Sequence, residues 1–183
     1  MPYAYNGKLL HVDLMAGRWE IETIGEDVVR EYLLGSGLAA KMFIEEVDPS
    51  LDALDPASPL IFMTGLLTGT LVPTSSRSVV CGRSPLTGIW NETNFGGYWG
   101  AELKFAGYDG IIVTGKAEKP VYLWIDDDEV EIRPADELWG LETYETFERV
   151  RQTTDSKARV SCIGPAGENG GRLAGIAFDG QDT

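Results

Sequence analysis

The sequence predicts an α+β fold with two mixed or antiparallel β-sheets and several helices. Alternation of apolar and polar residues predicts two hairpins, and apolar runs bounded by glycine loops predict buried strands. The order hairpin, helix, apolar strand, glycine loop and strand occurs twice, from about Gly7 and again from about Pro120. This order indicates an internal duplication, and it argues against a doubly wound nucleotide fold, in which strand and helix alternate throughout.

The first half begins with an alternating hairpin over residues 7–24. Two amphipathic helices over 25–35 and 38–47 follow, and Asp48-Pro49 ends the second. A continuous apolar strand over 60–65, expected to be buried on both faces, runs into a glycine-rich loop that ends at Arg77. The next strand begins directly after this loop, so the sequence predicts that Arg77 is held at a loop mouth.

The segment TNFGGYWGAELKFAGYDG (93–110) is typical of a strand end, a glycine turn, a helix stopped by Gly107 and a new apolar strand. Asn91, Thr93 and Asn94 are residue types that cap helices. The Gly96-Gly97 pair lets a flat or bulky ligand approach the main chain, and helix amides favour an anion. A phosphate-bearing cofactor fits this chemistry, although for the glycine pair alone a purely structural tight turn is favoured.

The second half repeats this order with shorter elements. An alternating hairpin over 119–134 has the polar turn Asp126 to Asp128, and one helix or two short helices follow over 137–152. A strand over 158–164, a glycine loop over 164–172 and a strand over 173–180 complete the half. The acidic turn is most simply a solvated hairpin tip, because the spacing of a calcium loop is absent.

Composition restricts the class of function. The 183 residues suffice for one domain with a sizeable core, and the formal net charge of -14 disfavours nucleic acid and anionic membranes as partners. The apolar runs are far shorter than the ~20 residues of a membrane-spanning helix. We therefore expect a soluble, cytoplasmic protein.

No catalytic constellation is evident in the sequence. Cys81 and Cys162 lie apart in apolar settings without a metal-ligand spacing, so buried reduced thiols are favoured over a disulfide or a metal site. His11 has no second histidine or cysteine nearby, and neither a Walker loop nor G-x-G-x-x-G is present. The residues alone indicate a binding domain without catalytic machinery of its own.

Three segments, residues 60–88, 93–140 and 162–169, resemble the N-terminal domain of the tungsten-containing aldehyde ferredoxin oxidoreductases in order and spacing. The stretch GGYWGAELKFAGYDGIIVTGKAEKPVYLWI is the most specific part of this resemblance. The resemblance implies two halves of a common plan and a tungstopterin cofactor, with tungsten or molybdenum between two pterin-dithiolenes whose phosphates are bridged by Mg²⁺. It also implies a 4Fe-4S cluster that passes electrons to ferredoxin, and the oxidation of an aldehyde substrate to the carboxylic acid.

The resemblance implies cofactor-binding residues at the positions of this sequence that match the family's motifs. Arg77 matches the arginine that contacts the pterin, Asn94 the asparagine associated with the bridging Mg²⁺, and Gly96 the glycine of close approach. Their expected shell is Thr93, Phe95 and Gly97. Arg77, with Arg83, would have to form a small positive pocket on a strongly negative protein.

The chain departs from the family pattern at Leu34 and Ser36, where many members carry glycine and arginine, and at Phe95, where a small residue is usual. Phe95 would either stack on a pterin or narrow the approach of substrate, and the sequence does not choose between these.

Residues 1–183 are expected to form a single N-terminal tungstopterin-binding domain, truncated from a larger enzyme. The cysteines that bind the cluster and the substrate pocket would lie in the missing domains, so the chain alone would be inactive. Apolar surface that those domains cover would then be exposed, which predicts self-association into a homo-oligomer. The alternatives are a separately encoded subunit, a tungsten enzyme that acts on another substrate such as an aromatic thioester, and a non-catalytic pterin-binding or subunit-contact module.

Overall fold

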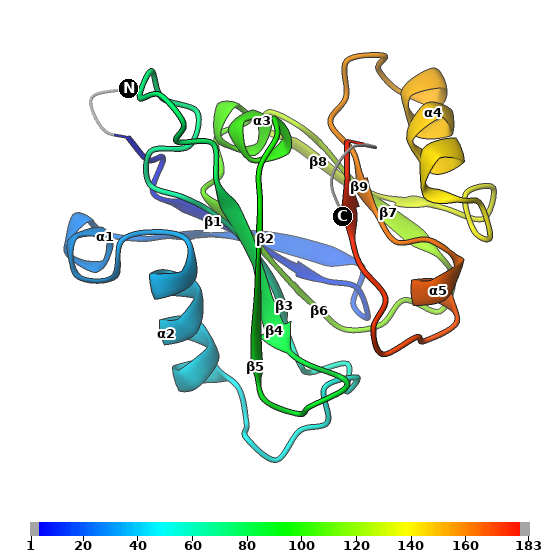
Figure 1. Cartoon of the computed structure of the whole chain (residues 1–183), viewed down its shortest axis with the longest axis horizontal. Coiled ribbons are helices and arrows are strands. Elements are labelled where there is room, and N and C mark those ends of the chain that lie inside the picture. Colours follow the sequence, from blue (N-terminus) through cyan, green and yellow to red (C-terminus); the bar gives the residue numbers. More distant parts are fainter. Residues whose placement is uncertain (1–3, 180–183) are drawn as a thin grey trace.

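A six-stranded mixed β-sheet forms the centre of the computed structural model, which describes residues 4–179 (Figure 1). Its strands are β1 (Lys8–Asp13), β2 (Arg18–Thr23), β3 (Leu60–Thr64), β4 (Ser78–Arg83), β5 (Trp90–Phe95) and β6 (Gly110–Thr114), in the spatial order β2-β1-β6-β3-β4-β5. Neighbouring strands are antiparallel except β1 and β6, which run parallel. The apolar strands β3 and β4 have side chains in hydrophobic clusters on both faces of the sheet, which explains why their sequences do not alternate.

Helices α1 (Glu26–Tyr32) and α2 (Ser36–Glu46) cover one face of this sheet (Figure 1). The hydrophobic core on this side contains Val29, Leu38 and Met42 from the helices. They pack against strand residues that include Leu9, Ile61, Met63, Val79, Cys81 and Ile112. The predicted helices are confirmed, and α2 begins two residues earlier than its apolar pattern indicated.

The other face of the sheet is covered by helix α3 (Trp99–Phe105) and by the hairpin of β7 (Val121–Asp126) and β8 (Glu129–Pro134). A second core cluster joins Leu10, Val12, Leu103, Tyr108, Ile111 and Val130. The indole Nε1 of Trp19 donates a hydrogen bond of 3.0 Å to the carbonyl oxygen of Val130, which ties β2 to β8. The second predicted hairpin therefore packs as a layer on the central sheet.

The remaining residues form a small unit on the opposite side of the molecule from α2 (Figure 1). It contains α4 (Thr143–Thr153), β9 (Ser161–Cys162), α5 (Pro165–Glu168) and β10 (Ala177–Phe178). Its core is formed by Phe147, Val150, Val160 and Ala177.

Among residues 4–179, no helix has the length and apolar character needed to cross a bilayer.

The predicted α+β class is confirmed, and the order of elements does recur in the second half. The recurrence is incomplete, because β7-β8 and β9-β10 form two separate two-stranded antiparallel sheets within the described chain. The strands predicted over 158–164 and 173–180 shrink to two residues each, and the short helix α5 interrupts the glycine loop between them. The last residue of the predicted final strand, Gly180, and the polar end of the chain lie outside the described residues.

Candidate functional site

Arg77 and Gly96 lie side by side where β4 begins and β5 ends. Ser78 pairs with Phe95 in the β4-β5 ladder, so the register extended by one residue sets Arg77 opposite Gly96. The guanidinium Nη1 of Arg77 lies 3.9 Å from the position that a Cβ on Gly96 would take. The structure thus brings together two of the three residues that the resemblance implied most directly.

Strand β5 divides the predicted site residues between its two faces. Successive side chains of a strand point to opposite faces, so Asn94 lies on the side of α2, whereas Thr93 and Phe95 lie on the side of α3. By the same alternation, Gly96 and the guanidinium beside it share the side of Asn94. Arg77, Asn94 and Gly96 therefore share one face at this end of β5.

The side chain of Asn94 belongs to a small polar network that sequence reasoning did not find. Its Nδ2 donates a hydrogen bond of 3.0 Å to Oε1 of Glu92, and the same oxygen accepts a bond of 2.7 Å from the Ser36 hydroxyl. Ser36, which departs from the family pattern, is thus linked through Glu92 to the predicted site. Nothing in the local sequence signals this link, because it joins the start of α2 to an exposed edge strand.

Phe95 is part of the core rather than of an open surface. Its side chain is only 6% exposed, and its ring stacks on Phe178 with 3.7 Å between ring centroids. Trp99 contacts the same ring edge-on at 5.8 Å. Phe95 therefore packs in the core on the α3 side of β5, directly before the glycine turn. One face of its ring is already covered by Phe178.

Two glycines of this turn, Gly96 and Gly97, and Gly100 in α3 differ in what a side chain would do at their positions. Gly97 has a φ of +78°, a conformation that residues with a side chain rarely adopt. A Cβ on Gly100 would collide with the hydroxyl of Ser78, so α3 packs on β4 only because Gly100 has no side chain. A Cβ on Gly96 would meet nothing closer than the Ser76 carbonyl oxygen, at 3.7 Å. The fold itself does not require a glycine at position 96.

The predicted helix caps are wrong. Asn91, Thr93 and Asn94 lie within β5, because the ladder with β4 continues to Phe95. Helix α3 begins at Trp99 after Tyr98, without a side-chain cap. The predicted end is confirmed, since Gly107 has a φ of +98° directly after the helix.

The loop of residues 65–77 presents Arg77 from a fixed backbone. The carbonyl oxygen of Arg77 accepts hydrogen bonds from the Gly65 amide at 2.9 Å and from the Thr68 hydroxyl at 2.6 Å. The Ser76 hydroxyl donates to the carbonyl oxygen of Gly97, which ties the loop to the glycine turn. Within residues 4–179, the exposed guanidinium of Arg77 forms no hydrogen bond or ion pair. It is therefore a cation available to a ligand.

Arg83 does not join this positive site. It lies at the opposite end of β4, where its Nη1 donates to the carbonyl oxygens of Pro49 and Gly88 and its guanidinium lies over the ring of Phe43. The expectation that Arg83 contributes to the pocket is wrong, because β4 separates the two arginines by its full length.

The two cysteines are free, as predicted. Burial raises the pKa of the Cys81 thiol to about 12 and that of the Cys162 thiol to about 11, so both remain protonated at neutral pH. No group of three or more potential metal-ligating side chains is found in the described part of the chain. Thiolate chemistry therefore has no basis in the described residues.

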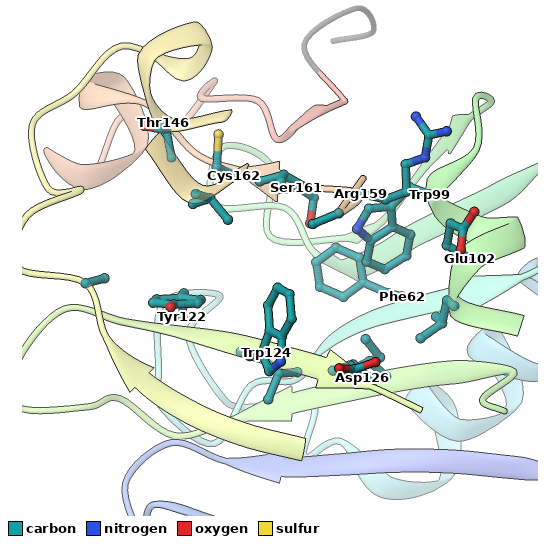
Figure 2. Close-up of a pocket in the computed structure, with 18 of the residues that line it drawn as sticks. Phe62, Trp99, Glu102, Tyr122, Trp124, Asp126, Thr146, Arg159, Ser161 and Cys162 are labelled. Atoms are coloured by element: carbon teal, nitrogen blue, oxygen red, sulfur yellow. The ribbon is translucent and has the colours of Figure 1, made fainter. Parts of the chain in front are cut away.

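A cavity of about 580 Å³ lies elsewhere, between α3, the β7-β8 hairpin and the C-terminal unit (Figure 2). Its lining is largely apolar and includes Phe62, Trp99 and Trp124, with Arg159 at the rim. The guanidinium of Arg159 lies 4.7 Å from the ring centroid of Tyr98. None of the predicted site residues lines this cavity, and the sequence did not predict it because its walls come from distant segments.

Comparison with known proteins gives a consistent result. Residues 9–183 match the sequence model of the family described as "Aldehyde ferredoxin oxidoreductase, N-terminal domain". The tungsten-containing aldehyde ferredoxin oxidoreductase of Pyrococcus furiosus is 45% identical over 98% of this chain, and an aliphatic sulfonate oxidoreductase, WOR-like subunit, of the same organism is 37% identical over 95%. The chain spans 30% of the length of each of these relatives.

A solved structure shows the same fold. The active site complex BamBC of benzoyl coenzyme A reductase, in complex with 1,5-dienoyl-CoA, matches with a TM-score of 0.94 and 40% sequence identity. The match covers 96% of this chain and 27% of that chain.

Proposed function

Because this chain belongs to the aldehyde ferredoxin oxidoreductase family, we propose that residues 1–183 form the N-terminal domain that holds a tungstopterin cofactor within a larger cytoplasmic oxidoreductase. When bound, the cofactor would supply the redox chemistry that oxidises an aldehyde to a carboxylic acid. Electrons would then leave through a 4Fe-4S cluster, ligated by other domains, to ferredoxin. The family model and the tungsten-containing relatives support this proposal.

The single observation that carries the cofactor site is the pairing of an unpartnered guanidinium with a glycine that the fold does not require. Arg77 would form charge-assisted, bidentate hydrogen bonds with a phosphate or with the heterocycle edge. Gly96 would let a flat ring lie against the main chain, where any side chain would hold it away. Gly97 gives the turn its left-handed conformation, while Thr93 and Phe95 would support the site from the opposite face of β5.

Asn94 would contribute an oxygen toward the Mg²⁺ between the cofactor phosphates. Its Nδ2 is already engaged by Glu92, which leaves the amide Oδ1 for a cation. Mg²⁺ prefers oxygen ligands and is usually bound through few protein groups together with phosphates and waters. The residues present therefore fit an ion that is held mainly by the cofactor.

Exposed apolar side chains beside the site support the remaining domains of the same enzyme as partners. Leu71 is fully exposed, and Leu67, Val72 and Phe105 are exposed around the same loop and the end of α3. Several large exposed apolar side chains on neighbouring segments are typical of interfaces. A domain packed on it would also exclude water from the neighbouring cofactor site.

The substrate is expected to be set outside this domain. The names of similar proteins include an aldehyde, an aliphatic sulfonate and a glyceraldehyde-3-phosphate oxidoreductase. The solved structure with the same fold is a component of a benzoyl coenzyme A reductase. This last likeness favours, as the alternative function, the same cofactor domain in an enzyme that acts on an aromatic thioester.

The test is the metal content of the full-length protein, purified without oxygen and measured by elemental mass spectrometry. We expect tungsten and iron in the wild type and loss of tungsten in the double variant Arg77→Ala/Asn94→Ala. Arg18→Ala, which removes an exposed arginine at the first hairpin turn, is the matched control and should retain tungsten. Unchanged tungsten in a folded double variant would show that these loops are structural turns, and a wild type without tungsten or molybdenum would contradict the cofactor proposal.

A further inference from the structure

Four separate segments of the chain meet at the buried pair of Lys104 and Asp109. Lys104 lies in the last turn of α3 and is 2% exposed, and Asp109, directly before β6, is fully buried. Charged side chains are rarely buried in this way, because removal from water is costly unless partners offset it. The groups that form hydrogen bonds with Lys104 and Asp109 therefore indicate the structural role of the pair.

Two main-chain carbonyl oxygens and one carboxylate surround the ammonium of Lys104. Its Nζ donates hydrogen bonds to the carbonyl oxygens of Ala4, at 2.7 Å, and Leu66, at 2.8 Å. Oδ1 of Asp109 lies 3.8 Å from Nζ, which is within ion-pair distance but too far for a hydrogen bond. Ala4 belongs to the N-terminal segment, whereas Leu66 belongs to the loop of residues 65–77 that carries Arg77.

Asp109 completes the attachment of the N-terminal segment. Its Oδ2 accepts hydrogen bonds from the main-chain amides of Asn6, at 2.9 Å, and Gly7, at 2.6 Å. Its Oδ1 has no hydrogen-bond partner within the described chain, so Lys104 is the charge that balances it. The carbonyl oxygen of Asp109 accepts two bonds from Thr64, at the end of β3.

The loop that Lys104 reaches also packs on α3 through glycines. A Cβ on Gly69 would stand 3.7 Å from Cβ of Lys104 and 3.4 Å from the ring of Phe105. At the other end of the helix, Gly100 lies against Ser78 and Thr68, and Thr68 binds the carbonyl oxygen of Arg77. Helix α3 and the loop of residues 65–77 thus contact each other near both ends of the helix. The hydrogen bond from the Lys104 ammonium to the Leu66 carbonyl oxygen joins a charged side chain of the helix directly to the loop backbone.

We propose that Lys104, charge-balanced by Asp109, is a positioning residue that fixes the loop of residues 65–77 on α3 and so holds Arg77 beside Gly96. The β4-β5 register sets Arg77 opposite Gly96, and the bond from Lys104 to Leu66 fixes the other end of the loop on α3, so the loop that carries Arg77 is anchored at both ends. A side chain that only packed would allow the loop to slide. An ammonium with two fixed carbonyl acceptors and one fixed countercharge is satisfied in one arrangement, so a displaced loop would leave a buried charge without its partners.

The test is hydrogen–deuterium exchange, read by mass spectrometry on the full-length protein, of the double variant Lys104→Met/Asp109→Asn. This variant removes both charges, so no lone charge is left buried. We expect exchange in residues 65–77 to become about ten- to a hundredfold faster, as for the loss of a buried hydrogen bond to a charged group. Exchange in β4 should remain as in the wild type, and Lys116→Met, at an exposed lysine, is the surface control.

Unchanged exchange in residues 65–77 of the folded double variant would overturn the proposal. Faster exchange by the same factor in every segment would also overturn it, because the pair would then stabilise the fold as a whole. If the double variant does not fold, native-state exchange of the wild type decides, since amides of the loop and of residues 104–109 should open with one shared free energy.

This inference rests on the proposed function only for what Arg77 binds, and the same samples separate the two. Faster loop exchange with loss of tungsten supports both proposals. Faster loop exchange with full tungsten retains the positioning role and counts against Arg77 as a cofactor residue. Unchanged loop exchange with loss of tungsten rejects the positioning role and leaves the cofactor site standing.

Discussion

The aromatic rings of Phe95 and Phe178 stack face to face, with 3.7 Å between their centroids and 9° between their planes. Phe95 ends β5 directly before Gly96, whereas Phe178 lies in β10, near the end of the described chain. Both side chains are at most 6% exposed. The last strand of the C-terminal unit is therefore the support on which the glycine turn of the candidate site rests.

Phe178→Ala is expected to lower the free energy of unfolding by about 3–5 kcal/mol, because it removes a buried ring and leaves a cavity beneath Phe95. Chemical denaturation of the purified protein measures this change. Leu173→Ala is the matched control, since Leu173 is 83% exposed, and it should change stability by less than about 0.5 kcal/mol. Equal effects of the two substitutions would show that the Phe95–Phe178 stack is not formed.

Gly97→Ala is expected to lower folding stability, whereas Gly96→Ala is expected to lower tungsten content with little change in stability. Gly97→Ala forces a side chain into a left-handed conformation and should cost about 1–2 kcal/mol of stability. Gly96→Ala meets no close atom and should leave stability within about 1 kcal/mol of wild type. If a ligand lies against Gly96, this second variant loses tungsten while remaining fully folded. Denaturation curves and metal content on the same preparations provide the comparison, and full tungsten in Gly96→Ala would argue against close approach at this residue.

Neither cysteine should react readily with thiol reagents in the folded protein. Burial raises the thiol pKa to about 12 for Cys81 and about 11 for Cys162, so near pH 8 the thiolate fraction is about a hundredfold or more below that of an ordinary cysteine. A colorimetric disulfide reagent should label both residues at once in denaturant and neither rapidly without it. Cys162, which is partly exposed, should be the faster of the two. Rapid labelling of Cys81 without denaturant would contradict its buried position.

The sequence predicts most elements correctly, since their signals are local. The hairpin of β1 and β2 and that of β7 and β8 alternate over their whole lengths, and both are present. The caps at Asn91, Thr93 and Asn94 were wrong because pairing with β4, which is not a local signal, extends β5 through Phe95. The short strands β9 and β10 were overestimated for the opposite reason, since their apolar runs pack in a small core without a longer partner strand.

The candidate site was predictable only in part. Arg77 and Gly96 are far apart in the sequence, and family resemblance rather than spacing placed them together. The network of Ser36, Glu92 and Asn94 crosses between elements and leaves no local pattern. Lys104 is equally hidden, because the last turn of an amphipathic helix is where an exposed lysine is ordinarily expected.

The buried Lys104 predicts a pH dependence of stability with a definite sign. Burial lowers the pKa of Lys104 from 10.5 to about 8, and the charge of Asp109 opposes this shift only in part. Between about pH 8 and 10.5 the unfolded chain therefore binds more protons at this residue than the folded chain does. Stability rises with pH wherever the unfolded state binds more protons, so the contribution of Lys104 to the free energy of unfolding increases across this window.

The expected increase is at most about 3 kcal/mol, because one pKa unit corresponds to about 1.4 kcal/mol. Other groups titrate in the same range, so the measured quantity is the difference in unfolding free energy between the wild type and Lys104→Met/Asp109→Asn. That difference should grow in favour of the wild type as pH rises from about 8 to about 10. A neutral amine retains two N–H donors for Ala4 and Leu66, which is why the loop is expected to stay attached at alkaline pH. A difference that is flat or falls with pH would mean that Lys104 titrates near its ordinary pKa and is solvated in solution.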